Sequence, residues 1–419
     1  MRFGINTLDD MEVQGKTVLC RIDINQPVDQ ATGTLKDTTR IEACTSTLKE
    51  LSDKGARVVL LAHQGSDIEY KNFYTTAPHA QVLSELLGKP VRFIDDVCGP
   101  AARAAIQTLK PGELLLLDNV RFVAEEQTLF EMKLRLSHAA QAKTLLVKKL
   151  APLGDLYVCD AFAAAHRDQP SLCGFEQVLP SAMGRLFEAE FCVISSLMEN
   201  PQRPCVFVLG GAKIHDAFLM MSTVLGGGIA DTVLTGGLVG EVLLWADGKD
   251  IGKPAREFIK REGYEPLVET GKALLAQYRS RIIMPGDFAG VGEGKRVEYP
   301  LGAIPPDLLV LDIGTETARS YQDRIKQAKT IFVNGPMGVF EEGSTEKGTR
   351  MVWDALGETP GYTVIGGGDS IAATKKYGKT GLISYICTGG GALIRFLTGE
   401  ELPVVKALRY GSKLTKKHL

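Results

Sequence analysis

The 419-residue sequence lacks a surplus of charge of either sign and lacks long apolar runs. It carries 48 Lys and Arg against 50 Asp and Glu, a net charge of −2 at pH 7, so it has no basic excess of the kind that binds nucleic acid. Its longest apolar runs are strand-sized, such as Leu114 to Leu117, and no signal-like apolar region lies near the N-terminus. We therefore expect no nucleic-acid partner, no membrane span, a cytoplasmic location and a monomer acting on small molecules.

The sequence also lacks paired cysteines. Its eight cysteines occur at positions 20, 44, 98, 159, 173, 192, 205 and 387, without a C-x-x-C pair. Most of them lie inside apolar, strand-like runs. We therefore interpret them as reduced, buried, small hydrophobic residues rather than metal ligands.

The length exceeds the size at which a single hydrophobic core stops growing, which predicts two domains of roughly 200 residues. Apolar strand-like runs alternate with helical patterns through both halves, including a long helix expected around Thr128 to Leu150 and another from Glu188 that stops at Asn200 and Pro201. This alternation is typical of α/β domains with parallel sheets.

In the first half, polar residues follow each strand-like run. They are Asp23 and Asn25, His63, Asn119 and Arg121, and finally Asp160, His166 and Arg167. In an open parallel sheet the ligand lies beyond the carboxyl ends of the strands, so these groups should converge. Taken singly, each histidine could be a structural residue with its hydrogen bonds satisfied. Several arginines together with the histidines instead indicate a site for a small polyanion, because guanidinium groups bind phosphate and carboxylate oxygens bidentately.

Arg40 opens a predicted helix whose apolar stripe is Ile41, Cys44, Leu48 and Leu51. A positive charge in the first turn is unfavourable for the helix dipole. That local misfit favours a functional role for Arg40 over a merely solvated arginine.

In the second half, glycines follow the strand-like runs. They occur at 210–211 with Lys213 nearby, at 236–237, at 335–338, at 366–368 and at 389–391. A glycine-rich turn is common without any ligand, but five such strand ends in one half favour a nucleotide lying across that edge.

The stretch Thr363 to Thr374 runs from a β-branched segment through three glycines to Asp369 and Ser370. Glycines let backbone N–H groups converge on phosphate, and a carboxylate suits Mg²⁺ bound to nucleotide phosphates. The alternative is an ordinary strand-to-helix turn, because the stretch is neither a Walker loop nor a G-x-G-x-x-G fingerprint.

Eight motifs, in this order, resemble those of the phosphoglycerate kinase family over nearly the whole chain. They are Arg-Ile-Asp-Ile-Asn-Gln-Pro at 21–27, Thr-Arg-Ile at 39–41, Asn-Val-Arg-Phe at 119–122, Asp-Ala-Phe at 160–162 with His166 and Arg167, Gly-Gly-Ala-Lys at 210–213, Asn-Gly-Pro-Met-Gly-Val-Phe-Glu at 334–341, Gly-Gly-Gly-Asp-Ser at 366–370, and Thr-Gly-Gly-Gly-Ala at 388–392.

The resemblance implies two Rossmann-like, three-layer α/β domains with parallel sheets, joined by a hinge, with the ligand cleft between them. We expect an N-terminal phosphoglycerate domain over 1–187, a hinge helix and linker over 188–204, a C-terminal Mg-nucleotide domain over 205–398, and a segment, 399–419, that returns to the first domain. The implied reaction is reversible phosphoryl transfer from 1,3-bisphosphoglycerate to ADP.

The resemblance also implies the site residues. Those expected to bind 3-phosphoglycerate are Asp23, Asn25, Arg40, His63, Gln64, Gly65, Ser66, Arg121, His166 and Arg167. Those expected to bind ADP or ATP are Gly211, Lys213, Gly236, Gly237, Asn334, Pro336, Gly338, Glu341, Gly366, Gly367, Gly368, Asp369 and Ser370. Arg40 and Lys213 would contact the transferring phosphoryl group, Glu341 the ribose hydroxyls, and Asp369 the Mg²⁺.

The chain departs from the family pattern at Ser66, Ala163 and Ala217. At Ser66 and Ala217 the common pattern has an arginine and a lysine, so this chain has less positive charge there. The departures motivate an alternative, a nucleotide-binding homologue with weakened catalysis. A dinucleotide-dependent oxidoreductase, suggested by the α/β pattern alone, lacks a G-x-G-x-x-G turn after the first strand.

The expected chemistry needs no general base. Phosphoryl transfer between an acyl phosphate and ADP has a carboxylate oxygen and a phosphate oxygen as leaving group and nucleophile, and both are ionised at pH 7. Catalysis then consists of alignment, neutralisation of charge on the equatorial oxygens, and exclusion of water after hinge closure.

Overall fold

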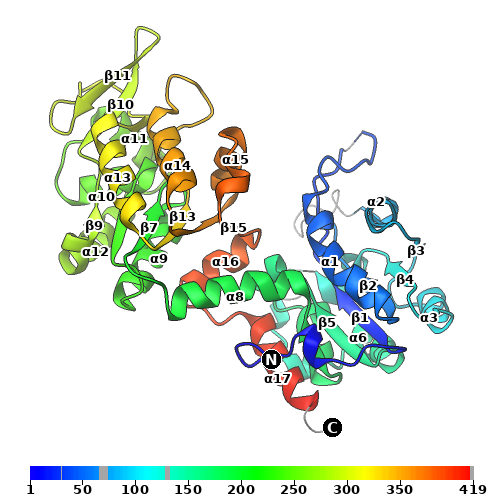
Figure 1. Ribbon diagram of the computed structural model, residues 1–419. Helices are drawn as coiled ribbons and strands as arrows, with labels where there is room; N and C mark the ends of the chain where they lie inside the picture. The colour runs from blue at the N-terminus through cyan, green and yellow to red at the C-terminus, as the bar shows by residue number, and fades with distance from the viewer. Residues whose placement is uncertain (30, 66–73, 128–132, 416–419) are drawn as a thin grey trace. The chain divides into compact units, whose positions relative to one another are not determined.

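The computed structural model describes residues 1–29, 31–65, 74–127 and 133–415. The chain divides into two units. Unit 1 comprises Met1–Cys192 together with Glu401–Leu419, and unit 2 comprises Val193–Glu400. Figure 1 shows the path of the chain by colour.

Unit 1 contains a six-stranded sheet in the order β3-β4-β2-β1-β5-β6, in which every pairing is parallel. Its strands are β1 (Thr17–Arg21), β2 (Arg57–Leu61), β3 (Val91–Ile94), β4 (Leu114–Leu117), β5 (Leu156–Cys159) and β6 (Ser181–Met183). Its helices are α1 (Thr39–Asp53), α2 (Ala77–Leu87), α3 (Pro100–Gln107), α5 (His138–Gln141), α6 (Leu145–Leu150), α7 (Pro170–Cys173) and α17 (Pro403–Thr415), while α8 (Arg185–Glu199) runs from unit 1 into unit 2.

Unit 2 repeats this design with a second six-stranded parallel sheet, in the order β15-β14-β13-β7-β8-β9. Its strands are β7 (Cys205–Leu209), β8 (Thr232–Thr235), β9 (Ile282–Ile283), β13 (Thr330–Asn334), β14 (Tyr362–Gly366) and β15 (Tyr385–Ile386). Its helices are α9 (Ile214–Gly226), α10 (Gly237–Ala246), α11 (Lys253–Arg261), α12 (Leu267–Tyr278), α13 (Thr315–Gln327), α14 (Lys347–Glu358), α15 (Gly368–Lys376) and α16 (Gly390–Leu397).

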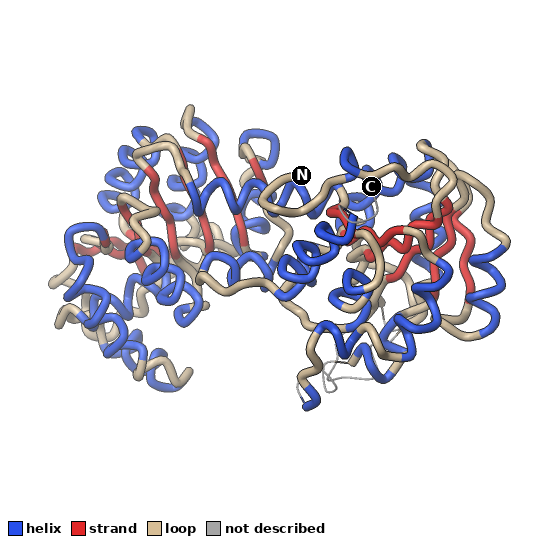
Figure 2. Tube along the Cα trace, turned by 90° about the horizontal axis from the view of Figure 1, so that it is seen from below, coloured by secondary structure: helices blue, strands red, loops and turns tan. Residues whose placement is uncertain are grey.

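Helices cover both faces of each sheet (Figure 2), which confirms the predicted three-layer α/β class. In unit 1 the core lies where the stripe Ile41, Cys44, Leu48 and Leu51 of α1 packs on the sheet. Parallel strands with helices on both faces are buried throughout, which is why β1, β4 and β5 consist wholly of buried residues.

The predicted helix from Thr128 to Leu150 is wrong over its described part. Residues 133–134 are helical, helical geometry is interrupted at Arg135, whose φ is 44°, and two short helices, α5 and α6, follow before residue 151. Ser137 then starts α5, and its hydroxyl accepts a hydrogen bond from the Ala140 backbone N–H at 3.3 Å. An N-cap residue such as this serine marks the start of a new helix, even where the spacing of apolar residues in the sequence suggests one continuous helix.

Unit 2 also contains an antiparallel three-stranded sheet that the sequence did not predict. It is formed by β10 (Asp287–Gly292), β11 (Lys295–Pro300) and β12 (Asp312–Ile313), in the order β11-β10-β12. Among the described residues, no helix has the length and apolar character that a membrane span requires.

Candidate active site

The edge of unit 1 at the carboxyl ends of its strands carries an anchored arginine. Arg40 lies in the first turn of α1 and forms an ion pair with Asp23, which follows β1, at 3.0 Å between Nη1 and Oδ2. The Asp23 side chain is 6% exposed and the Arg40 side chain 41% exposed. Because a guanidinium group has five N–H donors, Arg40 is fixed by one contact and keeps others for an anion.

The loop after β2 is fastened to the neighbouring strand ends. Asn25 Oδ1 accepts a hydrogen bond from the Gly65 backbone N–H at 2.9 Å. Asn119, which follows β4, accepts from the Gln64 N–H at 3.2 Å and donates to the Gln64 carbonyl at 2.7 Å. Three of the predicted substrate-binding residues, Asn25, Gln64 and Gly65, are thus held in one network.

His63 lies among arginines. Burial lowers the pKa of its imidazole well below the ordinary value, and the charges of Arg21, Arg121, Arg167 and Arg40 lower it further. His63 is therefore neutral at pH 7. Arg21 Nη2 lies 3.1 Å from His63 Nδ1, and because arginine only donates, Nδ1 accepts and the proton sits on Nε2.

A buried chain of hydrogen bonds orients Arg21. Its Nε donates to Ser171 Oγ at 3.0 Å, and that hydroxyl donates to Glu126 Oε2 at 2.7 Å. The Ser171 backbone N–H donates to the other Glu126 oxygen at 2.6 Å. Sequence reasoning missed Glu126 and Ser171 because the sheet edge brings together segments that are far apart in the chain.

The structure brings eight of the ten predicted substrate residues together through these contacts and through the charges acting on His63: Asp23, Asn25, Arg40, His63, Gln64, Gly65, Arg121 and Arg167. His166 directly precedes Arg167 after β5. Ser66 lies outside the described residues. A pocket of about 430 Å³ adjoins the edge and is lined by Asn25, Arg40, Gln64 and Gly65, with Lys36 and Tyr74 as further polar residues that the sequence did not single out.

The glycine-bearing edge of unit 2 is built from neighbouring strand ends. Asn334 of β13 pairs in register with Gly366 of β14. Gly367 has a φ of 88°, and a Cβ there would lie 2.3 Å from Asn334 Oδ1, so this position requires glycine on both grounds. Ser370 Oγ accepts a hydrogen bond from the Gly335 N–H at 2.6 Å, which ties the start of α15 to the end of β13.

Some of these glycines are required by packing alone. A Cβ at Gly338 would lie 2.3 Å from the Leu311 carbonyl oxygen, whereas none of the described atoms comes within 4 Å of a Cβ at Gly368. The glycine at 338 therefore needs no ligand to explain it, while Gly368 leaves open space at the start of α15.

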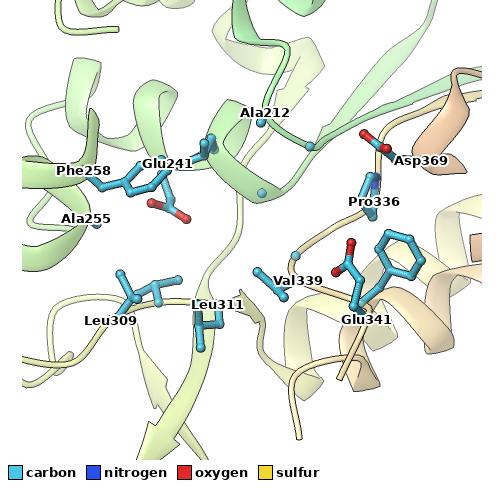
Figure 3. Close-up of a pocket in the computed structure, with 16 residues that line it drawn as sticks. Ala212, Glu241, Ala255, Phe258, Leu309, Leu311, Pro336, Val339, Glu341 and Asp369 are labelled. Atoms are coloured by element: carbon cyan, nitrogen blue, oxygen red, sulfur yellow. The ribbon is translucent and has the colours of Figure 1, made fainter. Parts of the chain in front are cut away.

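A pocket of about 340 Å³ lies at this edge (Figure 3). The predicted nucleotide residues that line it are Gly211, Gly237, Pro336, Gly338, Glu341 and Asp369. The others, Lys213, Gly236, Asn334, Gly366, Gly367, Gly368 and Ser370, belong to the same strand ends and helix starts but not to its lining. Lys213 is exposed in the position before the first residue of α9.

Apart from Val339 and Phe340, which lie in the motif at 334–341, sequence reasoning missed the apolar wall of this pocket. The wall consists of Leu238, Ala255, Phe258, Leu309, Val310, Leu311, Val339 and Phe340. Ala255 and Phe258 belong to α11, and Leu309 to Leu311 lead into β12. An apolar wall beside a few polar groups is typical of pockets for flat organic ligands, but no short motif signals it, because its residues come from separate segments.

Glu241 on α10 is the second residue that sequence reasoning missed. It lines the pocket among the apolar residues and is 6% exposed. Burial raises the pKa of its carboxyl from 4.5 to about 8. A glutamate within an otherwise apolar helix resembles an ordinary surface residue in the sequence, so only the fold reveals it.

Asp369 has the properties of a Mg²⁺ ligand. It lies in the first turn of α15, lines the pocket and is exposed. Among the described residues, no Lys or Arg forms an ion pair with it, so its oxygens remain available. A hard cation shared with phosphate oxygens needs one or two such carboxylates.

A second group of potential metal ligands consists of His138, Asp168 and Cys173, whose ligand atoms lie within 4.8 Å of one another. The group is joined by its own contacts, including His138 Nε2 to Asp168 Oδ1 at 3.3 Å. Burial raises the pKa of the Cys173 thiol well above its ordinary value, which disfavours the thiolate that a metal needs. All eight cysteines are free.

Comparisons with known proteins agree with this geometry. The family model for phosphoglycerate kinase matches residues 8–400. The chain is 46% identical over 406 residues to phosphoglycerate kinase from Methanothermobacter thermautotrophicus, covering 97% of both chains. It is 46% identical over 408 residues to that from Methanobacterium bryantii, covering 97% of this chain and 98% of the relative.

Solved structures lead to the same family. Phosphoglycerate kinase from Pyrococcus horikoshii has a TM-score of 0.86 at 40% identity, covering 98% of this chain and 100% of that one. Phosphoglycerate kinase from Coxiella burnetii has a TM-score of 0.82 at 29% identity, covering 96% and 98%. These matches agree with the two parallel sheets and with their polar and glycine-bearing edges. The chain therefore belongs to the phosphoglycerate kinase family.

Proposed function

We infer that unit 1 binds the phosphoglycerate and unit 2 the nucleotide in the reaction that this kinase catalyses. The reaction is the reversible transfer of a phosphoryl group from 1,3-bisphosphoglycerate to ADP, giving 3-phosphoglycerate and ATP. The family assignment excludes the oxidoreductase alternative. The single observation that supports this assignment of one substrate to each unit is a difference in chemistry. The edge of unit 1 is rich in arginine, whereas the pocket of unit 2 has an apolar wall.

In unit 1, the guanidinium groups of Arg40, Arg121 and Arg167 hold the anionic groups of the phosphoglycerate. Neutral His63 offers its Nε2–H as a further donor. A histidine kept neutral by burial and by its arginine neighbours donates to an anion without requiring a proton from solution, so this contact does not depend on the protonation of His63 near neutral pH.

In unit 2, the apolar wall holds the base, Glu341 accepts hydrogen bonds from the ribose hydroxyls, and the first turn of α15 faces the phosphates. Asp369 would hold Mg²⁺, which when bound neutralises charge on the nucleotide phosphates. Lys213 and Arg40 contact the transferring phosphoryl group and stabilise the charge on its equatorial oxygens.

Because the two substrates are held by different units, transfer requires closure about the connection between them, followed by in-line displacement without a general base. Closure also keeps water away from the acyl phosphate.

A coupled assay with the purified full chain tests this proposal. We expect ATP formation from 1,3-bisphosphoglycerate and ADP, abolished by EDTA, restored by excess Mg²⁺ and strongly reduced in Asp369→Asn. Glu269→Gln on α12, an exposed carboxylate paired with Lys272, is the control and should retain full activity. Nucleotide binding without ATP formation would instead support the catalytically weakened homologue that Ser66 and Ala217 suggest.

A further inference from the structure

The nucleotide pocket of unit 2 has a polar end and an apolar end. Asp369 and Glu341 lie at one end, and Phe258, Ala255 and Leu309 at the other (Figure 3). With phosphates near Asp369 and ribose near Glu341, the base reaches the apolar end.

Glu241 is the polar side chain at that apolar end. Its carboxyl group points into the pocket between Phe258 and Leu309 (Figure 3). It is 94% buried, since its exposed fraction is 6%, and within the described part of the chain no hydrogen bond or ion pair satisfies it. Burial is the cause of the raised pKa of its carboxyl group. A buried carboxyl without a partner is costly, so this group is available for a ligand.

We propose that Glu241, in its protonated form, recognises the Watson–Crick edge of adenine and thereby makes the affinity for ADP, relative to GDP, depend on the Glu241 proton. The inference rests on the function proposed above. The acid O–H donates to adenine N1, and the carbonyl oxygen of the same group accepts from the N6 amino group. This pair satisfies both carboxyl oxygens and holds the base in the plane set by the apolar wall.

Ionised Glu241 cannot make this pair. A carboxylate has no proton for adenine N1, and its charge would face the N1 lone pair. Guanine differs, because its N1–H and N2 amino groups both donate and can pair with a carboxylate, while its O6 and N1–H can pair with the neutral acid. ADP binding therefore requires the proton on Glu241, and GDP binding does not. Since the carboxyl titrates at about 8, the selectivity changes around that pH.

The charged groups on neighbouring elements do not disturb this titration. On α11 the charged residues pair with others: Lys253 with Glu257, Arg256 with Asp250, Lys260 with Glu265 and Arg261 with Glu262. On α12, Glu269 pairs with Lys272 and both are exposed, and on α9, His215 is exposed and Asp216 partly buried. The remaining titratable groups lining the pocket, Glu341 and Asp369, belong to its ribose and phosphate regions.

The test is the ratio of the GDP and ADP dissociation constants, measured by calorimetry on the full chain at constant Mg²⁺ from about pH 6 to pH 9.5. The ratio cancels the titration of the phosphates, which the two nucleotides share. We expect this ratio to fall by roughly 10- to 100-fold from the acidic to the alkaline end, because ADP alone loses its pair with Glu241 when the carboxyl ionises.

Two variants make the test specific. In Glu241→Gln the amide N–H donates to N1 and the amide oxygen accepts from N6 without any titrating group, so the ratio should not depend on pH. In Glu241→Met neither base finds this partner, so both nucleotides should bind more weakly with a ratio that does not depend on pH, while the melting temperature reports whether unit 2 is folded. Glu269→Gln should behave as the wild type.

A wild-type ratio independent of pH, or the same pH dependence in Glu241→Gln, would overturn the inference. The calorimetric result and the result of the coupled assay can be told apart, so each proposal can fail without the other. Loss of turnover with pH-dependent ADP selectivity would contradict the kinase mechanism alone, whereas turnover without such selectivity would contradict the role of Glu241 alone.

Discussion

At the scale of single residues, the positive charge at the edge of unit 1 comes from arginines, while the histidine among them, His63, stays neutral. Four arginines act on His63, and burial keeps the imidazole neutral. Arg40 forms an ion pair with the carboxylate of Asp23. The positive charge of the edge therefore comes from guanidinium groups and not from a group that titrates near pH 7, which suits an anionic ligand.

Arg40→Ala and Lys213→Ala should each reduce turnover by orders of magnitude and leave the fold intact. Arg40 is about 41% exposed and Lys213 is exposed, so neither supports the core. Each substitution removes a charge that stabilises the transferring phosphoryl group, and Arg40→Ala also removes a contact with the bound phosphoglycerate. Steady-state kinetics and circular dichroism check this, with Lys272→Ala as the exposed control. Near-normal turnover in either variant would contradict its assigned role.

Glu241→Gln should make unit 2 more stable than the wild type in alkaline solution. The folded chain binds the Glu241 proton more tightly, with a pKa of about 8 against 4.5 for the ordinary group. The stabilisation that this tighter proton binding gives to the folded state is therefore complete below pH 4.5, and it is lost as the pH rises through 8. The difference at pH 9 is at most about 5 kcal/mol.

Urea unfolding followed by tryptophan fluorescence measures this difference selectively, since the two tryptophans, Trp245 and Trp353, both belong to unit 2. Glu269→Gln should show no pH-dependent change relative to the wild type. Equal pH dependence of unfolding in the wild type and in Glu241→Gln would refute the burial-driven titration.

At the scale of elements, the sequence predicted the parallel strands and failed where structure depends on distant partners. Apolar runs such as Leu114 to Leu117 are unambiguous because both faces of these strands are buried. The break at Arg135 and the short strand β12 carry no periodic signal, since a two-residue strand is defined only by pairing with β10. The same limit applies to the site: strand-end residues were predicted, but Glu241 and the apolar wall depend on how α10 and α11 pack.

The small sheet of unit 2 is fixed by a buried ion pair. Arg296 of β11 contacts Asp312 of β12 at 2.9 Å, and the Gly348 N–H of α14 donates to the same carboxylate oxygen at 2.6 Å. The Asp312 side chain is 0% exposed. This contact positions the residues before β12 that line the nucleotide pocket.

Arg296→Met should destabilise unit 2 by roughly 3 kcal/mol, because it leaves Asp312 buried without its counter-charge. It should also weaken ADP binding by displacing Leu309 to Leu311. Arg319→Met, which breaks an ion pair with Glu316 that is more than half exposed, should change stability by less than about 0.5 kcal/mol. Tryptophan fluorescence during urea unfolding gives both values, and equal effects would argue against the buried pair.

At the scale of the whole molecule, two similar α/β units present different chemistry at the same edge of their sheets. Unit 1 collects arginines and amides after β1, β2 and β4, and unit 2 collects glycines, a carboxylate and an apolar wall after β7, β8, β13 and β14. The chain passes through α8 into unit 2 and returns with α17 to unit 1. Function therefore follows from the residues at the strand ends rather than from the fold that both units share.

The most direct measurement is a crossed calorimetric titration of two variants with two ligands. We expect Arg40→Ala to weaken 3-phosphoglycerate binding by about tenfold or more and to leave Mg-ADP binding unchanged. Glu341→Ala should weaken Mg-ADP binding by a similar factor and leave 3-phosphoglycerate binding unchanged. If either variant weakens both ligands equally, or if the two ligands compete for one site, the assignment of one substrate to each unit is contradicted.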